Sequence, residues 1–234
     1  MKNFTLLKKS SPKLLLLLTM AVSIVACKKT DTTETPVTNL RVVNSSPTAA
    51  TYNVYLSGTQ INSVALPFAG ASVYKAGSPG TYTLKFTTAS NTESLLSKDL
   101  TLAQNKYSSF YLINKPGQLD GLLTTDDVST PDATKAYIRF INLSPDAAAL
   151  DLAKTGATTP LISNKAFKAI SGFIAVDAGS ISFDAKETSG GAVKITLAGT
   201  TLAAGYHYDV IFGGLANPAS DAERPFTLQV LKIQ

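Results

Sequence analysis

The strongest constraint on the fold is an internal repeat. Residues 40–50 read Leu-Arg-Val-Val-Asn-Ser-Ser-Pro-Thr-Ala-Ala, and residues 138–148 read Ile-Arg-Phe-Ile-Asn-Leu-Ser-Pro-Asp-Ala-Ala. Later parts of the chain continue the match with a slightly larger offset: Gly80 corresponds to Gly179, and Tyr107 is matched with Tyr208. A small drift over so long a unit indicates two copies of one domain rather than a stack of short repeats.

Each copy has the residue pattern of β-strands. Residues 81–87, Thr-Tyr-Thr-Leu-Lys-Phe-Thr, alternate polar and apolar side chains, and residues 180–186 do the same. This period of two predicts that Leu84 and its counterpart Phe183 face equivalent cores. With about seven short strands per copy, separated by Gly and Pro turns, the chain is predicted to be all-β. We expect two tandem immunoglobulin-like antiparallel β-sandwich domains.

The expected organisation has five parts. We expect a lipoprotein signal peptide at residues 1–26, a lipidated cysteine with a flexible tether at 27–38, a first sandwich at 39–128, a linker at 129–135 and a second sandwich at 136–234. Pro131 should stiffen the linker. Each sandwich is expected to fold by itself, because each would have its own core.

The only cysteine, Cys27, directly follows a secretion-type segment. Four lysines precede an apolar run at residues 14–25, which is shorter than the about 20 residues that span a bilayer but suits a signal peptide. The run ends in Ile-Val-Ala-Cys, which resembles the lipobox of bacterial lipoproteins. The resemblance implies that Cys27 carries the lipid that attaches the chain to its membrane. The alternative is an ordinary signal peptide with a cysteine near its cleavage site.

The location is predicted from the residues around Cys27. No Asp follows the cysteine directly, which in enteric-type sorting implies transport to the outer membrane. We therefore expect a lipid-anchored protein of the cell envelope at the outer membrane, and both the periplasmic and the outer face stay open.

The formal charge argues against a nucleic-acid partner. The full chain has 21 basic and 16 acidic residues, a net charge of +5. Four of the basic residues and none of the acidic ones lie in the segment expected to be removed, which leaves 17 against 16, or +1. A mature chain with this balance has no basic field to hold nucleic acid.

The opening of each copy resembles a known family. The run Arg-Val-Val-Asn-x-Ser-Pro-x-Ala-Ala from Arg41, followed by Tyr-Asn-Val-Tyr at 52–55, is similar to the start of the DUF4397 family, a domain of unknown function. Residues 202–208 and 122–127 also resemble it, so the resemblance covers nearly all of residues 39–234 as two copies. The tether's Lys-Lys-x-Asp start resembles Bacteroidota lipoproteins. The resemblance implies an exported bacterial protein and lends no catalytic residue.

The residue types offer little catalytic chemistry. His207 is the only histidine, and we expect a surface residue on a sheet rather than a base or metal ligand, because one imidazole cannot build the usual zinc sites. Asp120, Asp126 and Asp127 could bind calcium weakly, but without an Asp-x-Asp loop we expect a solvated turn. We therefore expect no catalytic residue, no cofactor and no metal, and the protein is predicted not to be an enzyme.

Two further features have both a structural and a functional interpretation. The Asn-x-Ser-Pro segments at 44–47 and 142–145 are expected to be turns that end a strand, although a ligand site is the alternative. The chain has no Trp, so Tyr55, Tyr74 and Tyr111 are the candidates for a sugar-binding platform. Most aromatic residues are expected to fill the two cores instead.

These observations favour a non-enzymatic envelope protein that presents two sandwiches for binding, for adhesion or as an accessory subunit. The alternative is a carbohydrate-binding accessory lipoprotein of an outer-membrane glycan-utilisation system. The partner is thus a protein or a glycan that the residues do not name.

Overall fold

The computed structural model describes residues 35–233, and these residues form sixteen strands. Within this range no helix is long and apolar enough to cross a membrane. The strands of the first half are β1 (Thr38–Asn44), β2 (Tyr52–Leu56), β3 (Thr59–Gln60), β4 (Lys75–Gly77), β5 (Gly80–Thr88), β6 (Leu96–Leu102), β7 (Tyr107–Ile113) and β8 (Asp120–Asp126). Those of the second half are β9 (Lys135–Asn142), β10 (Leu150–Lys154), β11 (Ile162–Lys165), β12 (Ile174–Asp177), β13 (Gly179–Glu187), β14 (Val193–Leu202), β15 (His207–Gly213) and β16 (Thr227–Lys232).

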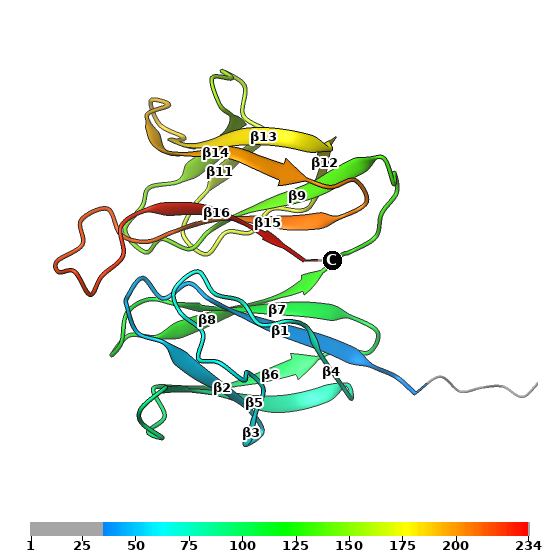
Figure 1. Cartoon of the computed structure of the whole chain (residues 1–234), viewed down its shortest axis with the longest axis vertical. Helices are drawn as coiled ribbons and strands as arrows, with labels where there is room; N and C mark the ends of the chain where they lie inside the picture. Colours follow the sequence, from blue (N-terminus) through cyan, green and yellow to red (C-terminus); the bar gives the residue numbers. More distant parts are fainter. Residues whose placement is uncertain (1–34, 234) are drawn as a thin grey trace, which may run out of the picture. The chain divides into compact units, whose positions relative to one another are not determined.

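Each half is a sandwich of two four-stranded sheets (Figure 1). The first sandwich has the strand orders β4-β1-β7-β8 and β3-β2-β5-β6. The second has β12-β9-β15-β16 and β11-β10-β13-β14, which is the same order shifted by eight strands. No sheet of residues 35–233 mixes strands from the two halves. The predicted all-β tandem sandwich is therefore confirmed.

The sequence predicts antiparallel sheets, but one strand pair in each sandwich is parallel. β1 pairs with β7 in parallel, and β9 pairs with β15 in parallel. A parallel pair needs a long connection between its strands. Here the strands of the opposite sheet supply that connection, because β2, β3, β5 and β6 all lie between β1 and β7 in the chain.

The parallel register also corrects one expected match between the copies. Asn39 lies opposite Tyr107 in the first sandwich, and Tyr137, which corresponds to Asn39, lies opposite His207 in the second. The counterpart of Tyr107 is thus His207, and the match with Tyr208 is wrong by one residue. A one-residue slip matters because it turns every side chain to the other face of the strand.

The predicted core positions are confirmed. Leu84 and Phe183 are both fully buried, in the separate apolar clusters of the first and second sandwich. Where one core has a larger side chain at a position, a neighbouring position has a smaller one, as expected of close-packed interiors. Where the first core has Phe86 stacked on Phe110 at 5.7 Å between ring centroids, the second has Ala185 beside the larger Phe183.

The Asn-x-Ser-Pro segments form turns, as predicted. The Asn44 side-chain oxygen accepts a hydrogen bond from the Ser46 backbone N–H at 3.0 Å, and Asn142 accepts the equivalent bond from Ser144 at 3.1 Å. The Asn44 amide donates to the Leu66 carbonyl and the Asn142 amide to the Lys165 carbonyl, each at 3.0 Å. Because both asparagines are fully buried, these bonds fix the turn rather than a ligand.

The ends of the first sandwich differ in detail from the expected parts. Thr38 is buried and already belongs to β1, although it was expected in the tether at 27–38. Residues 127–134 connect β8 to β9. The signal peptide at 1–26, Cys27 and most of the tether lie outside the described residues.

Candidate functional site

The two sandwiches meet through a third apolar cluster. It contains Val43, Tyr111 and Ile113 of the first sandwich and Ile141, Leu143 and Ile211 of the second. These side chains come from β1, β7, β9 and β15 or directly follow them, on the face away from each sandwich's own core. The four strands are accordingly buried along nearly their whole length instead of alternately, which is the sign of a sheet covered on both faces.

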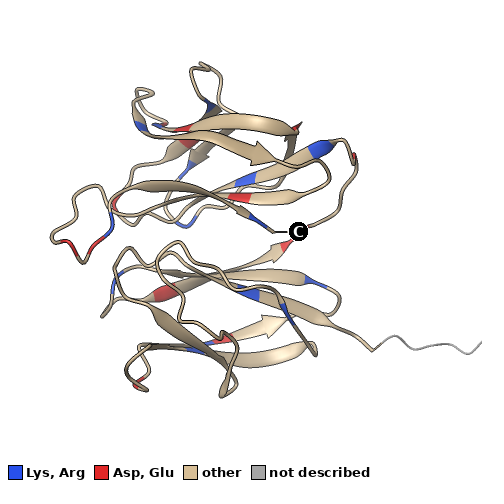
Figure 2. Ribbon diagram, viewed as in Figure 1, with Lys and Arg blue, Asp and Glu red and all other residues tan. Residues whose placement is uncertain are grey.

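Buried charges lie beside this cluster and join the two halves. Arg41 of the first sandwich donates to the carboxylate of Asp209 in the second. Arg139 donates from Nε to Asp209 Oδ1 at 2.6 Å and from Nη2 to Asp126 Oδ1 at 2.5 Å. The four residues are at most 3% exposed. Figure 2 shows blue and red segments on these strands.

Neutral hydroxyl groups complete the set of hydrogen bonds. Tyr111 donates to Asp209 and accepts from Arg139 Nη2 at 2.9 Å. Ser109 donates to Asp126 at 2.7 Å and accepts from Arg41 Nε at the same distance. We call Arg41, Ser109, Tyr111, Asp126, Arg139 and Asp209 the junction network. Two positive and two negative groups balance in it, as buried charges require.

The junction network holds its charges fixed. Burial raises the pKa of Tyr111 well above its usual value, so the phenol stays protonated. Burial by itself lowers the pKa of Arg139, but the surrounding Tyr111, Asp209 and Asp126 raise it above the usual value. The Arg41 guanidinium also lies over the ring of Tyr74, at 5.5 Å from its centroid. The Arg139 guanidinium therefore stays charged and the Tyr111 phenol stays neutral, which suits the hydrogen bonds that they make across the junction.

Three candidates from the sequence have structural surroundings that were not expected. Asp126 is not a solvated turn residue, because it ends β8 inside the junction network. Tyr111 cannot serve as a sugar platform, because it is fully buried. His207 is not a surface residue: it is 2% exposed, stacks on Tyr137 at 4.7 Å between ring centroids, and its Nε2 lies 2.9 Å from the Ser129 carbonyl. Burial lowers the pKa of His207, which favours the neutral ring.

The other two tyrosine candidates are only partly exposed. Tyr74 donates to Asp126 at 2.6 Å, so its hydroxyl is taken up by the junction. Tyr55 has the Lys85 ammonium over its ring at 5.0 Å. A cation thus lies over one face of each ring, Arg41 over Tyr74 and Lys85 over Tyr55. Residues 35–233 contain no group of three or more His, Cys, Asp or Glu side chains that could hold a metal ion.

Partly exposed contacts add a second connection between the halves. Lys115 of the first sandwich pairs with Glu223 of the second at 2.8 Å. The loop that carries Glu223 lies between β15 and β16 and bonds to the first Asn-x-Ser-Pro turn, with the Arg224 N–H donating to the Pro47 carbonyl at 3.0 Å. On the same junction, Asp120 pairs with Lys98 of its own sandwich and with Lys168 of the second at 2.8 Å.

The ion pairs of Asp120 predict a small acid sensitivity. Hydrogen bonds from Lys168 and Lys98 lower the pKa of Asp120 below its usual range. A lowered pKa in the folded state stabilises the protein above the unfolded pKa of about 4, and this stability is lost as pH falls through the folded value. We expect Asp120→Asn to lower the free energy of unfolding by less than about 1 kcal/mol at pH 7, because the group is partly exposed. In thermal unfolding curves the difference from the parent protein should shrink below about pH 4; a difference that grows on acidification would contradict this assignment.

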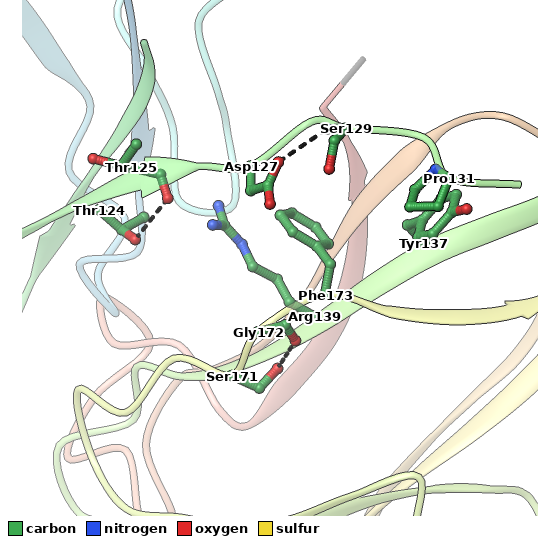
Figure 3. A pocket seen from close by; sticks show the side chains of 10 residues that line it. All are labelled: Thr124, Thr125, Asp127, Ser129, Pro131, Tyr137, Arg139, Ser171, Gly172 and Phe173. Carbon is green, nitrogen blue, oxygen red and sulfur yellow. Dashed lines mark hydrogen bonds between the residues drawn. The ribbon is translucent and has the colours of Figure 1, made fainter. Parts of the chain in front are cut away.

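A cleft of about 400 Å³ lies beside the junction network, and we call it the junction cleft (Figure 3). It is bordered by the end of β8, the connection to β9, β9 itself and the segment before β12. Its lining includes Thr124, Thr125, Asp127, Ser129, Arg139 and Phe173. The volume falls in the about 300–1,000 Å³ range of small-molecule sites.

Arg139 connects the cleft to the buried network. The guanidinium lies 4.7 Å from the centroid of the Phe173 ring, which covers one of its faces. Nε and Nη2 are used in the network, whereas Nη1 has no hydrogen-bond partner among residues 35–233. In Figure 3 the guanidinium points toward the side of the cleft where Asp127 lies. Asp127 and Arg139 form no ion pair within the described residues, so each can accept a further partner.

The junction and its cleft lie largely within a stretch that matches a known family. Residues 38–153 match DUF4397, a domain of unknown function. This stretch belongs to the DUF4397 family. The DUF4397 match begins with β1 and ends in β10, so it contains Arg41, Tyr111, Asp126 and Arg139 but not Asp209.

Comparisons with other proteins add little to the DUF4397 assignment. One similar solved structure is the N-terminal domain of AlgF from P. aeruginosa, at 18% identity and a TM-score of 0.30 over 39% of this chain and 94% of that one. Another is a family CBM26 module of Eubacterium rectale Amy13K in complex with maltoheptaose, at 10% identity and a TM-score of 0.25 over 80% of this chain and 100% of that one. Both TM-scores are too low to indicate a shared fold. No curated protein matches the sequence.

Proposed function

We propose that this DUF4397 protein is a non-catalytic binding module of the cell envelope, held at the outer membrane by a lipid on Cys27. The observation that carries the proposal is the buried junction between the sandwiches. Arg41, Arg139, Asp126 and Asp209 use their charges to join the halves into one body. A body of this kind holds the cleft and the loops around it in one fixed geometry, which lowers the entropy lost on binding a partner.

The environment of the titratable groups supports binding rather than catalysis. The fully buried Tyr111, whose pKa is raised well above its usual value by burial, donates to Asp209 within the junction network. The imidazole of His207 lies between two aromatic rings and contacts a backbone carbonyl. A catalytic base needs a free position within hydrogen-bond reach of a substrate. These groups instead stabilise the junction and the connection between the halves.

Membrane attachment gives the first test. We expect Cys27→Ser to abolish incorporation of labelled lipid and to release the protein from the membrane fraction, because stable anchoring requires the acyl chains. The measurement is metabolic lipid labelling with membrane fractionation, and Ser45→Ala, a change far from the leader, serves as the control. Two results together would refute the lipid anchor: the wild-type protein takes up no lipid label, and the Cys27→Ser variant still fractionates fully with membranes.

A carbohydrate-binding accessory role in a glycan-utilisation system is the second candidate. It is favoured by the junction cleft, whose lining combines the hydroxyl groups of Thr124, Thr125 and Ser129 with the charged side chains of Arg139 and Asp127. The two roles are separated by the partner. Binding to an immobilised glycan would support the accessory role, whereas specific crosslinking to an envelope protein without glycan binding would support a protein-binding module.

A further inference from the structure

We propose that the junction cleft binds one neutral sugar residue of a glycan, with its hydroxyl groups held between Arg139 Nη1 and the Asp127 carboxylate. This inference rests on the proposed role as a binding module and names the ligand class. The inference starts from Arg139, which is 98% buried and lines the cleft. Its Nη1 nitrogen has no hydrogen-bond partner among the described residues.

The local charge favours a neutral ligand over an anion. Arg139 already shares its charge with Asp126 and Asp209, and Arg41 pairs with Asp209 as well. With Asp127 on the opposite side of the cleft, these five groups sum to −1. A carboxylate or phosphate that entered the cleft would meet three carboxylates and only two guanidiniums. Repulsion between like charges at close range in a partly buried site raises the free energy of binding.

The geometry favours a group that both donates and accepts. Arg139 can only donate hydrogen bonds, and an ionised Asp127 can only accept them. One Asp127 oxygen already accepts the Ser129 N–H at 3.1 Å, and hydrogen bonds from Ser129 lower the pKa of Asp127, so the carboxylate stays charged. Neighbouring hydroxyls of a sugar match this pair, because one can accept from Nη1 while the next donates to the free carboxylate oxygen.

The remaining lining is consistent with a sugar ring. The Thr125 hydroxyl has no hydrogen-bond partner within residues 35–233 and is exposed beside the cleft. Pro131 and Phe173 supply apolar surface to the same cleft. A sugar ring presents hydroxyls at its edge and C–H groups on its faces, so a cleft with polar and apolar walls can contact both.

The experiment measures glycan binding by the full chain in detergent. Arrayed neutral oligosaccharides and arrayed uronate-containing oligosaccharides are compared, and hits are titrated by calorimetry. We expect binding to a neutral glycan, weakened at least about tenfold by Asp127→Asn, because a hydrogen bond to a charged group is lost. Asp99→Asn is the matched control, since it removes the same charge from the exposed face of β6, outside the cleft. Both positions are exposed, so both variants should keep the parent's thermal midpoint.

Each other outcome overturns a defined part of the inference. Neutral-glycan binding that is equally strong in Asp127→Asn would place the site elsewhere and leave the binding module intact. A preference for uronates that increases in Asp127→Asn would refute the neutral ligand class. The absence of any glycan binding would refute the sugar site, and the proposed module would then depend on whether a specific envelope protein crosslinks to the chain.

Discussion

Asp209→Ala is expected to lower the free energy of unfolding by about 3–5 kcal/mol. The substitution removes the carboxylate that accepts from both Arg41 and Arg139, and it leaves the Tyr111 hydroxyl without its acceptor. Two guanidiniums in a fully buried site would then share the single carboxylate of Asp126. Urea unfolding followed by circular dichroism measures the loss, and Asp209→Asn, which keeps the shape and one acceptor oxygen, should fall between the parent and Asp209→Ala.

An exposed ion pair provides the control. Asp177 pairs with Lys135 at 2.7 Å, but the Asp177 side chain is 76% exposed. Asp177→Ala should therefore change the free energy of unfolding by no more than about 0.5–1 kcal/mol. If Asp209→Ala proved as mild as Asp177→Ala, the junction network would contribute nothing to stability and the rigid-body basis of the proposed function would fail.

Separating the sandwiches is expected to have an even larger effect. A chain cut at residue 130 would expose Val43, Tyr111 and Ile113 on one half, and Ile141 and Ile211 with their neighbour Leu143 on the other. Each such side chain contributes about 1.5–3 kcal/mol when it is buried. We therefore expect either half alone to aggregate or to unfold without cooperativity, and an equimolar mixture to recover a soluble one-to-one complex in size-exclusion chromatography.

This expectation revises the sequence-based view that each half folds by itself. The view considered only the core within each sandwich, whereas the structure shows a further core between them. Halves that are separately monomeric and unfold cooperatively, with no tendency to associate, would restore the original view and would argue against a fixed junction cleft.

The part of the fold that depends on local pattern could be predicted. Alternation of side chains placed Leu84 and Phe183 in equivalent cores, and the Asn-Pro chemistry of residues 44–47 and 142–145 predicted turns. Both features are determined by a few neighbouring residues. The parallel pairing of β1 with β7 could not be predicted in this way, because it joins residues more than sixty positions apart.

The candidate site was mostly beyond prediction for the same reason. The sequence places Asp126 in an expected solvated turn, because its partner Arg139 belongs to the other sandwich. One signal was nevertheless present in the sequence. Arg41 and Arg139 interrupt otherwise apolar runs at equivalent positions, and Asp209 interrupts another such run. Each is thus a charged residue in an apolar strand pattern without an evident partner nearby in the sequence. A buried charge requires an opposite charge, and pairing these three with one another would have indicated the junction.

The junction network also shows that the two copies have become complementary rather than interchangeable. The arginines occupy equivalent positions, but the carboxylates do not: Asp209 lies opposite Arg139 on the neighbouring strand, where Ser109 lies opposite Arg41. The first copy contributes its carboxylate from the end of β8 instead. A protein assembled from two first halves or two second halves would keep the backbone symmetry. It would lose the ion pairs that each half makes with the other, Arg41 with Asp209 and Arg139 with Asp126. The two halves therefore have different, complementary contact surfaces. This difference favours the native pairing of a first half with a second half over association between like halves of different chains.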